Sequence, residues 1–79
     1  MRVTVLVRPK NGILDPQGEA VLGSLRHLGF DVDAVRIGRV VDIELTTADA
    51  AQARTDAKRM CEQLLANPLI ESVEIEVHE

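Results

Sequence analysis

Aromatic residues are almost absent from this sequence, which has one Phe and neither Tyr nor Trp among 79 residues. A core must therefore be built from aliphatic side chains. The net charge of −4 and the lack of aromatics together argue against nucleic-acid binding. Such binding needs cations that neutralise phosphates and, for single strands, aromatic rings that stack on bases. The nine Lys and Arg residues are scattered along the chain.

Cysteine and long apolar runs are also scarce. A single Cys cannot form an internal disulfide, which fits a reducing cytoplasm. There is no apolar run of about 18 residues, as a membrane helix needs, and no apolar segment typical of a signal peptide. We expect one cytoplasmic domain spanning residues 1–79, of the small size for which self-association is a common source of stability.

The segment 9–18 is unusually rich in turn-forming residues. Its prolines fix the backbone angle φ, and its glycines allow backbone angles that other residues avoid. Asp15 is suited to cap a helix, and Pro16 fits the first helical position, where its missing N–H leaves nothing unsatisfied. An apolar stripe follows up to Leu28, and Gly29 predicts the end of this helix.

Alternating apolar residues predict four strands, at residues 2–8, 30–37, 41–45 and 72–77. The phase changes at Ala34 and Val35, which indicates a bulge, and Gly38-Arg39 is suited to a hairpin turn. A second helix is expected over about residues 48–66, with Thr46 and Asp49 at capping-box spacing. Its apolar stripe is Ala53, Ala57, Met60, Cys61, Leu64 and Leu65.

The element order predicts an α+β domain of ferredoxin-like β-α-β-β-α-β type. Two right-handed crossovers would give a two-layer sandwich, with a four-stranded antiparallel sheet and both helices on one face. The first and third strands would be central.

No residue pattern predicts catalysis. Cys61 lies on an apolar stripe with no base spaced to activate it, so a small buried hydrophobe is expected. His27 and His78 have no further ligands to complete a metal site. The sequence around Gly12 and Gly18 matches neither of the two glycine-rich motifs that bind nucleotide phosphates. Around the hairpin, Arg36 and Arg39 could hold an anion or could be solvated.

Several segments together resemble the PurS family. They are Pro9-Lys10, Ile13 to Gly18, Leu28-Gly29, Val35 to Arg39, and Cys61 to Glu71. The resemblance covers nearly the whole chain in order and length. The family pattern usually has Lys at the position of Arg39 and an aromatic residue at the position of Val73.

The resemblance implies a role in purine biosynthesis. PurS proteins are small, non-catalytic subunits of phosphoribosylformylglycinamidine (FGAM) synthase, which converts formylglycinamide ribonucleotide to FGAM with ATP and glutamine. They self-associate, as dimers or tetramers, and join the glutaminase subunit to the synthetase subunit for ammonia transfer. ATP or ADP, magnesium and glutamine would be used by those partners, with no cofactor bound by this chain.

The expected partner contacts lie mostly in the turn-rich segment, and the others lie around the predicted hairpin and in the Asn67-Pro68 turn. For Asp15, Pro16 and Gly18, helix capping and docking both remain open. Two other functions stay open on the same topology: a ligand-binding regulatory domain, and a small transferase-like enzyme. The expected contact residues are Pro9, Lys10, Leu14, Asp15, Gln17, Gly18, Arg36, Arg39, Asn67 and Pro68.

Overall fold

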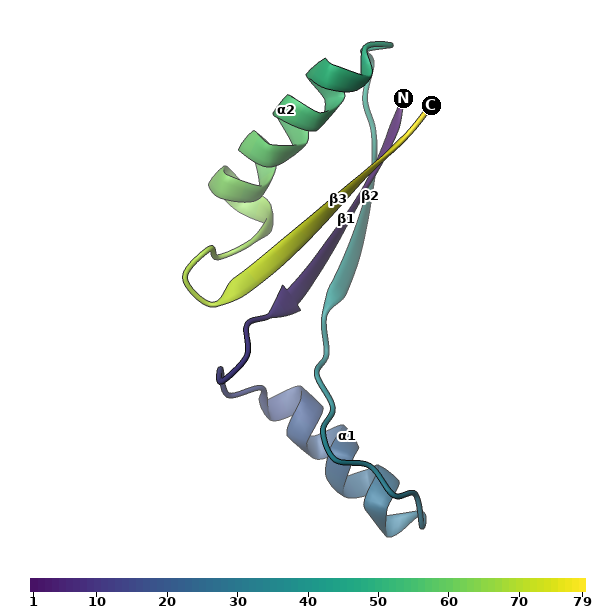
Figure 1. Ribbon diagram of the computed structural model, residues 1–79, viewed down its shortest axis with the longest axis vertical. Coiled ribbons are helices and arrows are strands. Elements are labelled where there is room, and N and C mark those ends of the chain that lie inside the picture. The colour runs from purple at the N-terminus through teal and green to yellow at the C-terminus, as the bar shows by residue number, and fades with distance from the viewer.

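The computed structural model describes residues 1–79 and contains three strands and two α-helices, one of them extended by a π-helical turn (Figure 1). No helix in it is long and apolar enough to cross a membrane. In chain order the elements are β1 (Arg2–Pro9), α1 (Pro16–His27), β2 (Arg39–Glu44), α2 (Ala50–Met60), the π-helical turn η1 (Cys61–Leu65) and β3 (Glu71–His78).

The three strands form an antiparallel sheet in the order β2-β1-β3. Val5 of β1 lies opposite Val41 of β2 and Ile75 of β3, so the apolar residues of all three strands share one face. Because side chains alternate along a strand, this register sends the polar residues to the other face. There Thr4 donates a 2.7 Å hydrogen bond to Asp42.

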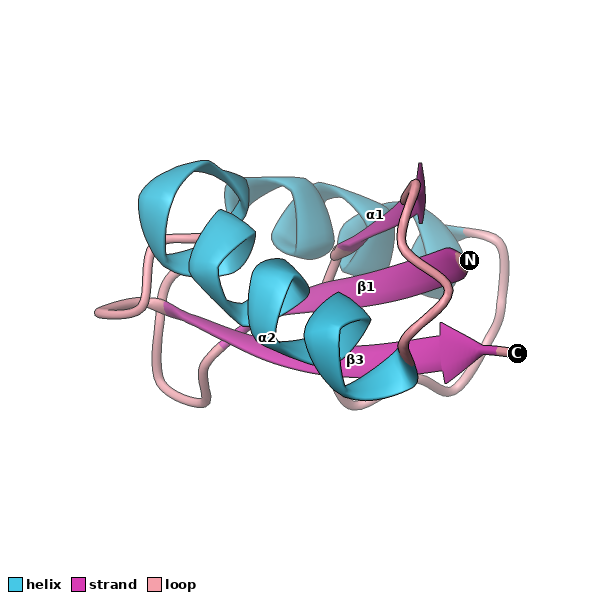
Figure 2. Ribbon diagram, turned by 90° about the horizontal axis from the view of Figure 1, so that it is seen from above, coloured by secondary structure: helices cyan, strands magenta, loops and turns pink.

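The core lies between this apolar face and α2, which crosses β1 and β3 (Figure 2). Val3, Val5 and Val7 are at most 1% exposed. They pack with Ala53 and Ala57, whose small side chains let the helix approach the sheet closely. The aliphatic core expected from the composition is confirmed, although only 8 of 79 residues are buried.

The second helix differs from its prediction at both ends. Its cap is Asp49, whose carboxylate accepts the N–H of Ala51, so α2 begins two residues later than expected. Past Met60 the chain widens into η1, where the Ala66 N–H reaches Cys61 C=O. The extra residue in a π-turn rotates the side chains that follow. Leu64 is therefore 84% exposed, and its expected place on the buried stripe is wrong.

The first helix does not lie on the sheet. Helix α1 and the returning segment 30–38 form an arm that extends from one end of the sheet (Figure 1). The molecule measures 48 × 25 × 14 Å, with a radius of gyration of 15.7 Å. A compact chain of this length would have a radius of gyration of about 12 Å. The prediction of two helices on one sheet face is wrong for the single chain.

The predicted strand at residues 30–37 and the hairpin after it are also wrong for the single chain. The segment has no strand partner, and the chain continues into β2 without turning at Gly38-Arg39. Two contacts fix this path. The Ile37 N–H donates to Asp15 at 2.7 Å, and Gly38 packs so closely on the Val7 carbonyl that an added Cβ would overlap it. As a result β2 is an edge strand rather than a central one.

Candidate partner interface

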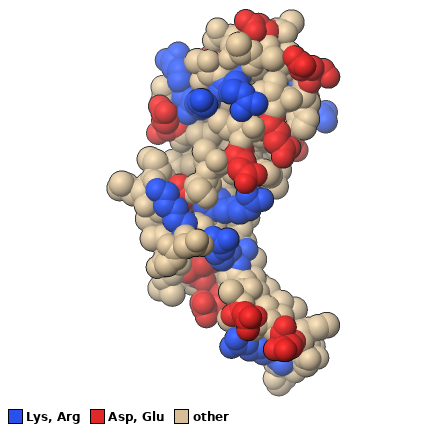
Figure 3. All heavy atoms as spheres, in the orientation of Figure 1, with Lys and Arg blue, Asp and Glu red and all other residues tan.

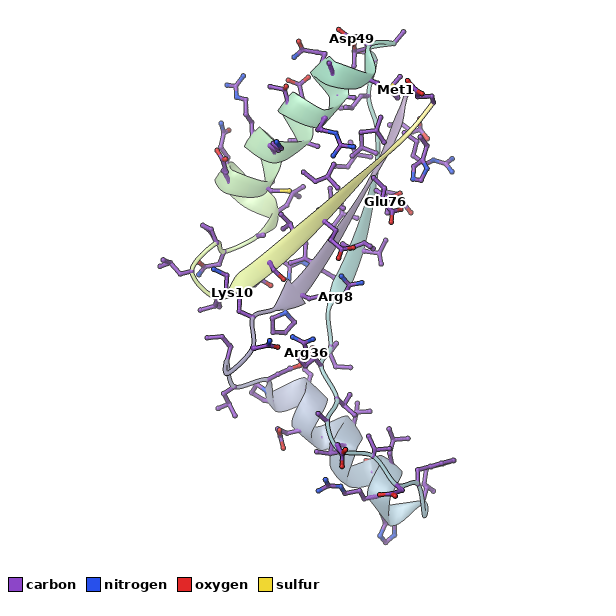
Figure 4. The ribbon with its side chains drawn as sticks, in the orientation of Figure 1. Met1, Arg8, Lys10, Arg36, Asp49 and Glu76 are labelled. Atoms are coloured by element: carbon purple, nitrogen blue, oxygen red, sulfur yellow. The ribbon has the colours of Figure 1, made fainter.

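The predicted contact residues meet where the arm joins the sheet. We call this region the joint and define it as residues 9–18, 35–39 and 64–71. The end of β1 and the beginnings of α1, β2 and β3 converge there. Figure 4 shows Arg8, Lys10 and Arg36 around it. Three turns that are distant in sequence therefore form one surface.

Asp15 links helix α1 to the returning chain. One carboxylate oxygen accepts the Gly18 N–H at 3.1 Å, which is the predicted helix cap. The other accepts the Ile37 N–H at 2.7 Å. These bonds, the one from Ile37 first, lower the pKa of Asp15, because both stabilise the carboxylate. Asp15 is thus the structural link between α1 and segment 35–37, beyond its role as a cap.

Gly18 and Gly12 are present for steric and conformational reasons. A Cβ at residue 18 would overlap the Val35 carbonyl oxygen and lie 2.6 Å from an Asp15 carboxylate oxygen. Gly18 therefore lets α1 pack directly on the returning chain, and as a buried residue it offers no side chain to a partner. Gly12 has φ of 83°, a conformation that favours glycine.

Lys10 and Arg36 are held in place by neutral groups. The Lys10 ammonium donates to the Pro68 carbonyl at 2.7 Å. The Arg36 guanidinium donates to the Pro9 carbonyl at 3.1 Å and to the Asn11 side-chain oxygen at 2.9 Å. Neither forms a salt bridge. Both positive charges are therefore oriented at the joint without a carboxylate to neutralise them.

Arg39 has a structural role that the sequence did not predict. Its guanidinium binds Glu71 through two hydrogen bonds, of 2.8 and 3.2 Å, and donates another to the Leu65 carbonyl. This fork connects the start of β2 to the start of β3 and the end of η1. The hydrogen bonds from Arg39 and then from the Asn67 N–H lower the pKa of Glu71. Arg is suited to this place because its planar fork matches a carboxylate.

Asn67 and Pro68 form the tight turn between η1 and β3. The Asn67 N–H donates to Glu71 at 2.8 Å, and its side-chain oxygen accepts the Leu69 N–H at 3.1 Å. The Asn67 carbonyl accepts N–H groups from Ile70 and Glu71. The turn thus presents the Pro68 carbonyl to Lys10, which brings this turn and the turn-rich segment together.

Exposed leucines surround these polar groups. Leu14 is 78% exposed, Leu69 is 82% and Leu64 is 84%. Gln17 is also exposed and makes no side-chain hydrogen bond within the chain. Sequence reasoning selected Leu14 and Gln17 but missed Leu64, Leu69, Asn11 and Glu71. The sequence did contain a signal for Glu71. It is an acidic residue at the start of an otherwise alternating last strand, where it could pair with an arginine of a neighbouring strand.

The chemistry expected at Cys61 agrees with its surroundings. Its side chain belongs to the core, and burial, with a smaller contribution from Glu62, raises the pKa of the thiol. A thiol of raised pKa stays protonated and is a poor nucleophile, as the buried-hydrophobe interpretation predicted. Cys61 also lines a shallow cavity of about 130 Å³ with Pro68, Glu71 and Val73.

Comparisons with known proteins agree with one another. Residues 2–79 match the family model described as PurS: phosphoribosylformylglycinamidine (FGAM) synthase. The chain is 43% identical over 77 residues to the synthase subunit PurS of Synechocystis, covering 96% of this chain and 75% of that one. It is 39% identical over 79 residues to that of Bacillus subtilis, covering 99% of this chain and 93% of that one.

Solved structures share the elongated shape. The structure of Bacillus subtilis PurS matches with a TM-score of 0.86 at 39% identity, covering 99% of this chain and 98% of that one. A chain of the structure of PurLQS from Thermotoga maritima matches with a TM-score of 0.85 at 29% identity, covering 95% and 93%. The arm is therefore a shared property of these chains.

The fold defines a class: small α+β proteins with a three-stranded antiparallel sheet and a helical arm at one end of it. Within that class the assignment is specific. The family match covers nearly the whole chain, and the two relatives cover 96% and 99% of it. The chain belongs to the PurS family, the small subunits of FGAM synthase.

Proposed function

We propose that the chain is a non-catalytic assembly subunit that joins the glutaminase subunit to the synthetase subunit of FGAM synthase. Membership of the PurS family makes it a subunit of this enzyme of purine biosynthesis. The further statement, that it connects the other two subunits through the joint, is the proposal. We expect the assembly to lie in the cytoplasm.

The observation that carries the proposal is the pair of unneutralised cations at the joint. Lys and Arg side chains gather at the narrow middle of the molecule, although the chain has a net charge of −4 (Figure 3). Lys10 and Arg36 bond only to neutral oxygen atoms there. Because their side chains are already ordered, they would lose little entropy on binding an acidic partner surface.

The exposed leucines supply the apolar part of the same surface. Leu14, Leu64 and Leu69 are each more than three-quarters exposed, so their side chains are open to a partner surface. Each buried leucine side chain contributes roughly 1.5–3 kcal/mol of transfer free energy. A partner that covers them and places carboxylates near Lys10 and Arg36 would match the surface in both shape and charge.

The consequence of such binding is proximity rather than chemistry. The glutaminase releases ammonia, and the synthetase uses ATP, magnesium and the formylglycinamide ribonucleotide. Holding the two sites together raises the effective concentration of ammonia and excludes water, in which ammonia would be protonated or lost. The chain itself needs no cofactor for this role.

The shapes of the surface hollows disfavour the alternative of a ligand-binding regulatory domain. Pockets for small ligands usually enclose about 300–1,000 Å³ and combine apolar walls with convergent polar groups. Two hollows reach about 470 and 410 Å³, but they are shallow and open to solvent, one along α1 and one beside the start of α2. The more enclosed cavity beside Cys61 holds only about 130 Å³ and is better suited to receive one side chain of a partner protein.

Reconstitution tests the proposal. The purified chain is mixed with its cognate synthetase and glutaminase in the presence of ADP and glutamine, and complex formation is measured by size-exclusion chromatography. Glutamine-dependent turnover is measured in parallel with ATP. We expect co-elution and a rise in turnover that requires the chain. Unchanged turnover without co-elution would contradict the assembly role.

Single substitutions locate the surface. Lys10→Ala, Arg36→Ala and Leu69→Ser should each weaken complex formation while leaving the fold intact, because all three side chains are exposed. Arg59→Ala is the matched control, since Arg59 is an exposed cation on α2 without a hydrogen bond or ion pair. Equal binding by the joint variants and the control would show that the partners bind elsewhere.

A further inference from the structure

The outer edge of β3 is an unpaired edge of the sheet, because the strand order is β2-β1-β3. Two hydrogen bonds show which backbone groups lie on that edge. The Lys10 N–H donates to the Ile70 carbonyl on the β3 side, and the Leu45 N–H donates to the Met1 carbonyl on the β2 side. Because the direction of bonding alternates along a strand, even-numbered residues of β1 bond toward β3 and odd-numbered residues toward β2.

The register then identifies the free groups of β3. Even-numbered residues of β1 lie opposite even-numbered residues of β3, so these residues bond to each other. The odd-numbered residues Val73, Ile75 and Val77 therefore direct their N–H and C=O groups outward. The hydrogen bond of 3.3 Å from the Arg54 guanidinium to the Ile75 carbonyl agrees with this direction.

Two contacts delimit the open part of this edge. The Glu71 N–H already bonds to the Asn67 carbonyl at 2.8 Å, and Arg54 covers the Ile75 carbonyl. Between them lie the Glu71 carbonyl, both backbone groups of Val73 and the Ile75 N–H. An antiparallel strand centred on Val73 would bond to these four groups through a segment of about five residues.

A cavity of about 130 Å³ adjoins this part of the edge. Its walls come from η1, the turn after it and the first half of β3, and they include Cys61, Pro68, Val73 and Ile75. An apolar cavity of about 150 Å³ holds a molecule of benzene, so this cavity can hold one side chain of the size of leucine. Residues directly opposite each other in neighbouring strands direct their side chains to the same face. A residue paired with Val73 would therefore direct its side chain toward the cavity.

The opposite face of β3 is acidic. The side chains of Glu74 and Glu76 are 65% and 53% exposed. Glu74 lies 3.3 Å from Arg8, and exposed ion pairs of this kind are weak, so its carboxylate can accept a further cation. Like charges opposite each other destabilise a sheet, so a second copy of β3, with its own glutamates, is poorly suited to this edge. A segment that carries lysine or arginine is well suited to it.

We propose that the edge of β3 at Val73 binds an extended segment of the synthetase or glutaminase subunit, in which an apolar residue is flanked by lysine or arginine. The backbone of the segment would add a strand to the sheet, and its apolar side chain would fill the cavity. One flanking cation would lie opposite Glu74. In such strand addition, main-chain hydrogen bonds supply affinity and side-chain pockets supply specificity. The bound segment rests on the proposed assembly role only for the identity of the protein that supplies it.

A synthetic peptide tests the site on the isolated chain. The probe is acetyl-KTKLKTK-amide, whose central leucine is meant for the cavity and whose lysines are meant for the acidic face. Titration into the ¹⁵N-labelled chain should shift the amide resonances of Val73, Ile75 and Cys61 in a saturable manner. Replacing the central leucine by glycine should weaken binding at least tenfold, because burial of a leucine side chain is worth about that factor or more.

N-methylation of the central leucine is the test of strand addition itself. It removes the N–H that would donate to the Val73 carbonyl and leaves the leucine side chain in place, so binding should again fall at least tenfold. The peptide acetyl-ETELETE-amide keeps the leucine and the backbone but reverses the charge, and it should not bind. These controls use the natural chain, so their results do not depend on whether a variant folds.

Proline substitutions locate the bound strand on the protein. Val73→Pro removes an N–H that faces outward, and proline is tolerated at such edge positions. This variant should bind the probe at least tenfold more weakly. Val77→Pro is the matched control, because it removes an outward N–H of the same edge beyond the expected segment. It should bind the probe within twofold of the natural chain.

Hydrogen exchange tests the same edge in the assembled complex. Addition of the cognate synthetase and glutaminase should slow exchange of the Val73 amide at least tenfold. No binding of the probe at millimolar concentration, or equal binding of the probe and its N-methylated form, would overturn the proposal. Unchanged exchange at Val73 in a complex that forms and turns over would overturn it as well. In that last case the assembly role would stand, since it is measured separately by co-elution and turnover.

Discussion

Replacing Arg39 by alanine should destabilise the protein by about 2 kcal/mol. The bidentate pair with Glu71 is partly screened by water, because the Arg39 side chain is 50% exposed and that of Glu71 is 17%. Exposed pairs contribute roughly 0.2–1 kcal/mol, and the bidentate geometry places this one near the upper value. The hydrogen bond to the Leu65 carbonyl adds about 1 kcal/mol.

Thermal denaturation followed by circular dichroism, at fixed protein concentration, measures this loss. For a domain of this size each kcal/mol corresponds to about 4–8 °C, so Arg39→Ala should lower the Tm by about 8–16 °C. Arg39→Lys should recover part of the loss, because lysine keeps the charge but cannot reproduce the planar fork. Arg59→Ala, at an exposed arginine without partners, should leave the Tm within about 2 °C.

A double-mutant cycle separates the ion pair from other effects of the substitution. Arg39→Ala, Glu71→Ala and the double variant should give a coupling free energy of about 1 kcal/mol. Coupling below about 0.3 kcal/mol would refute the claim that this pair connects β2 to β3. Arg39 would then be a free surface cation, available to a partner as the family resemblance implied.

Three further predictions concern the arm, the π-turn and acid stability. Gly23→Ala should stabilise α1 by about 1 kcal/mol, because the added Cβ meets nothing within 4 Å, whereas Gly18→Ala should destabilise it through overlap with the backbone. Leu64→Ser should change stability by less than about 0.5 kcal/mol and Leu65→Ser by clearly more, since η1 directs only the latter toward the core; similar losses would contradict the π-turn. The pKa of Glu71 is lowered in the folded protein, so its stabilisation is full above the ordinary value of 4.5 and is lost as pH falls through the folded value. Glu71→Gln should therefore flatten the decline in Tm as the pH falls below 4.5, and an unchanged decline would show that other carboxylates cause it.

Local signals predicted the elements that depend on neighbouring residues alone. Asp15 and Pro16 define the start of α1, because a cap needs only a side-chain oxygen and a free amide a few residues away. The alternation in β1 and β3 assigned their buried faces correctly, because side chains alternate along any strand. Gly29 ends α1 with φ of 96°, as its type suggests.

The joint was only partly predictable. The turn-rich segment identified Lys10 and Asp15, and the resemblance added Arg36 and Arg39. The roles of these residues depend on groups distant in sequence: Arg36 donates to Pro9, and Arg39 to Glu71. Such pairs form only when the sheet brings the ends of the strands together, so no local pattern reports them.

The aromatic-poor, turn-rich sequence by itself determined the start of α1, the apolar faces of β1 and β3, the aliphatic core and the family. The tertiary structure alone decided where segment 30–37 goes. Alternation specifies that an extended segment has a face to bury, but it does not specify which strand lies beside it, or in which molecule. That choice depends on the path at Gly38, where the close contact with Val7 and the bond from Ile37 to Asp15 hold the chain straight and leave the arm apart from its own sheet.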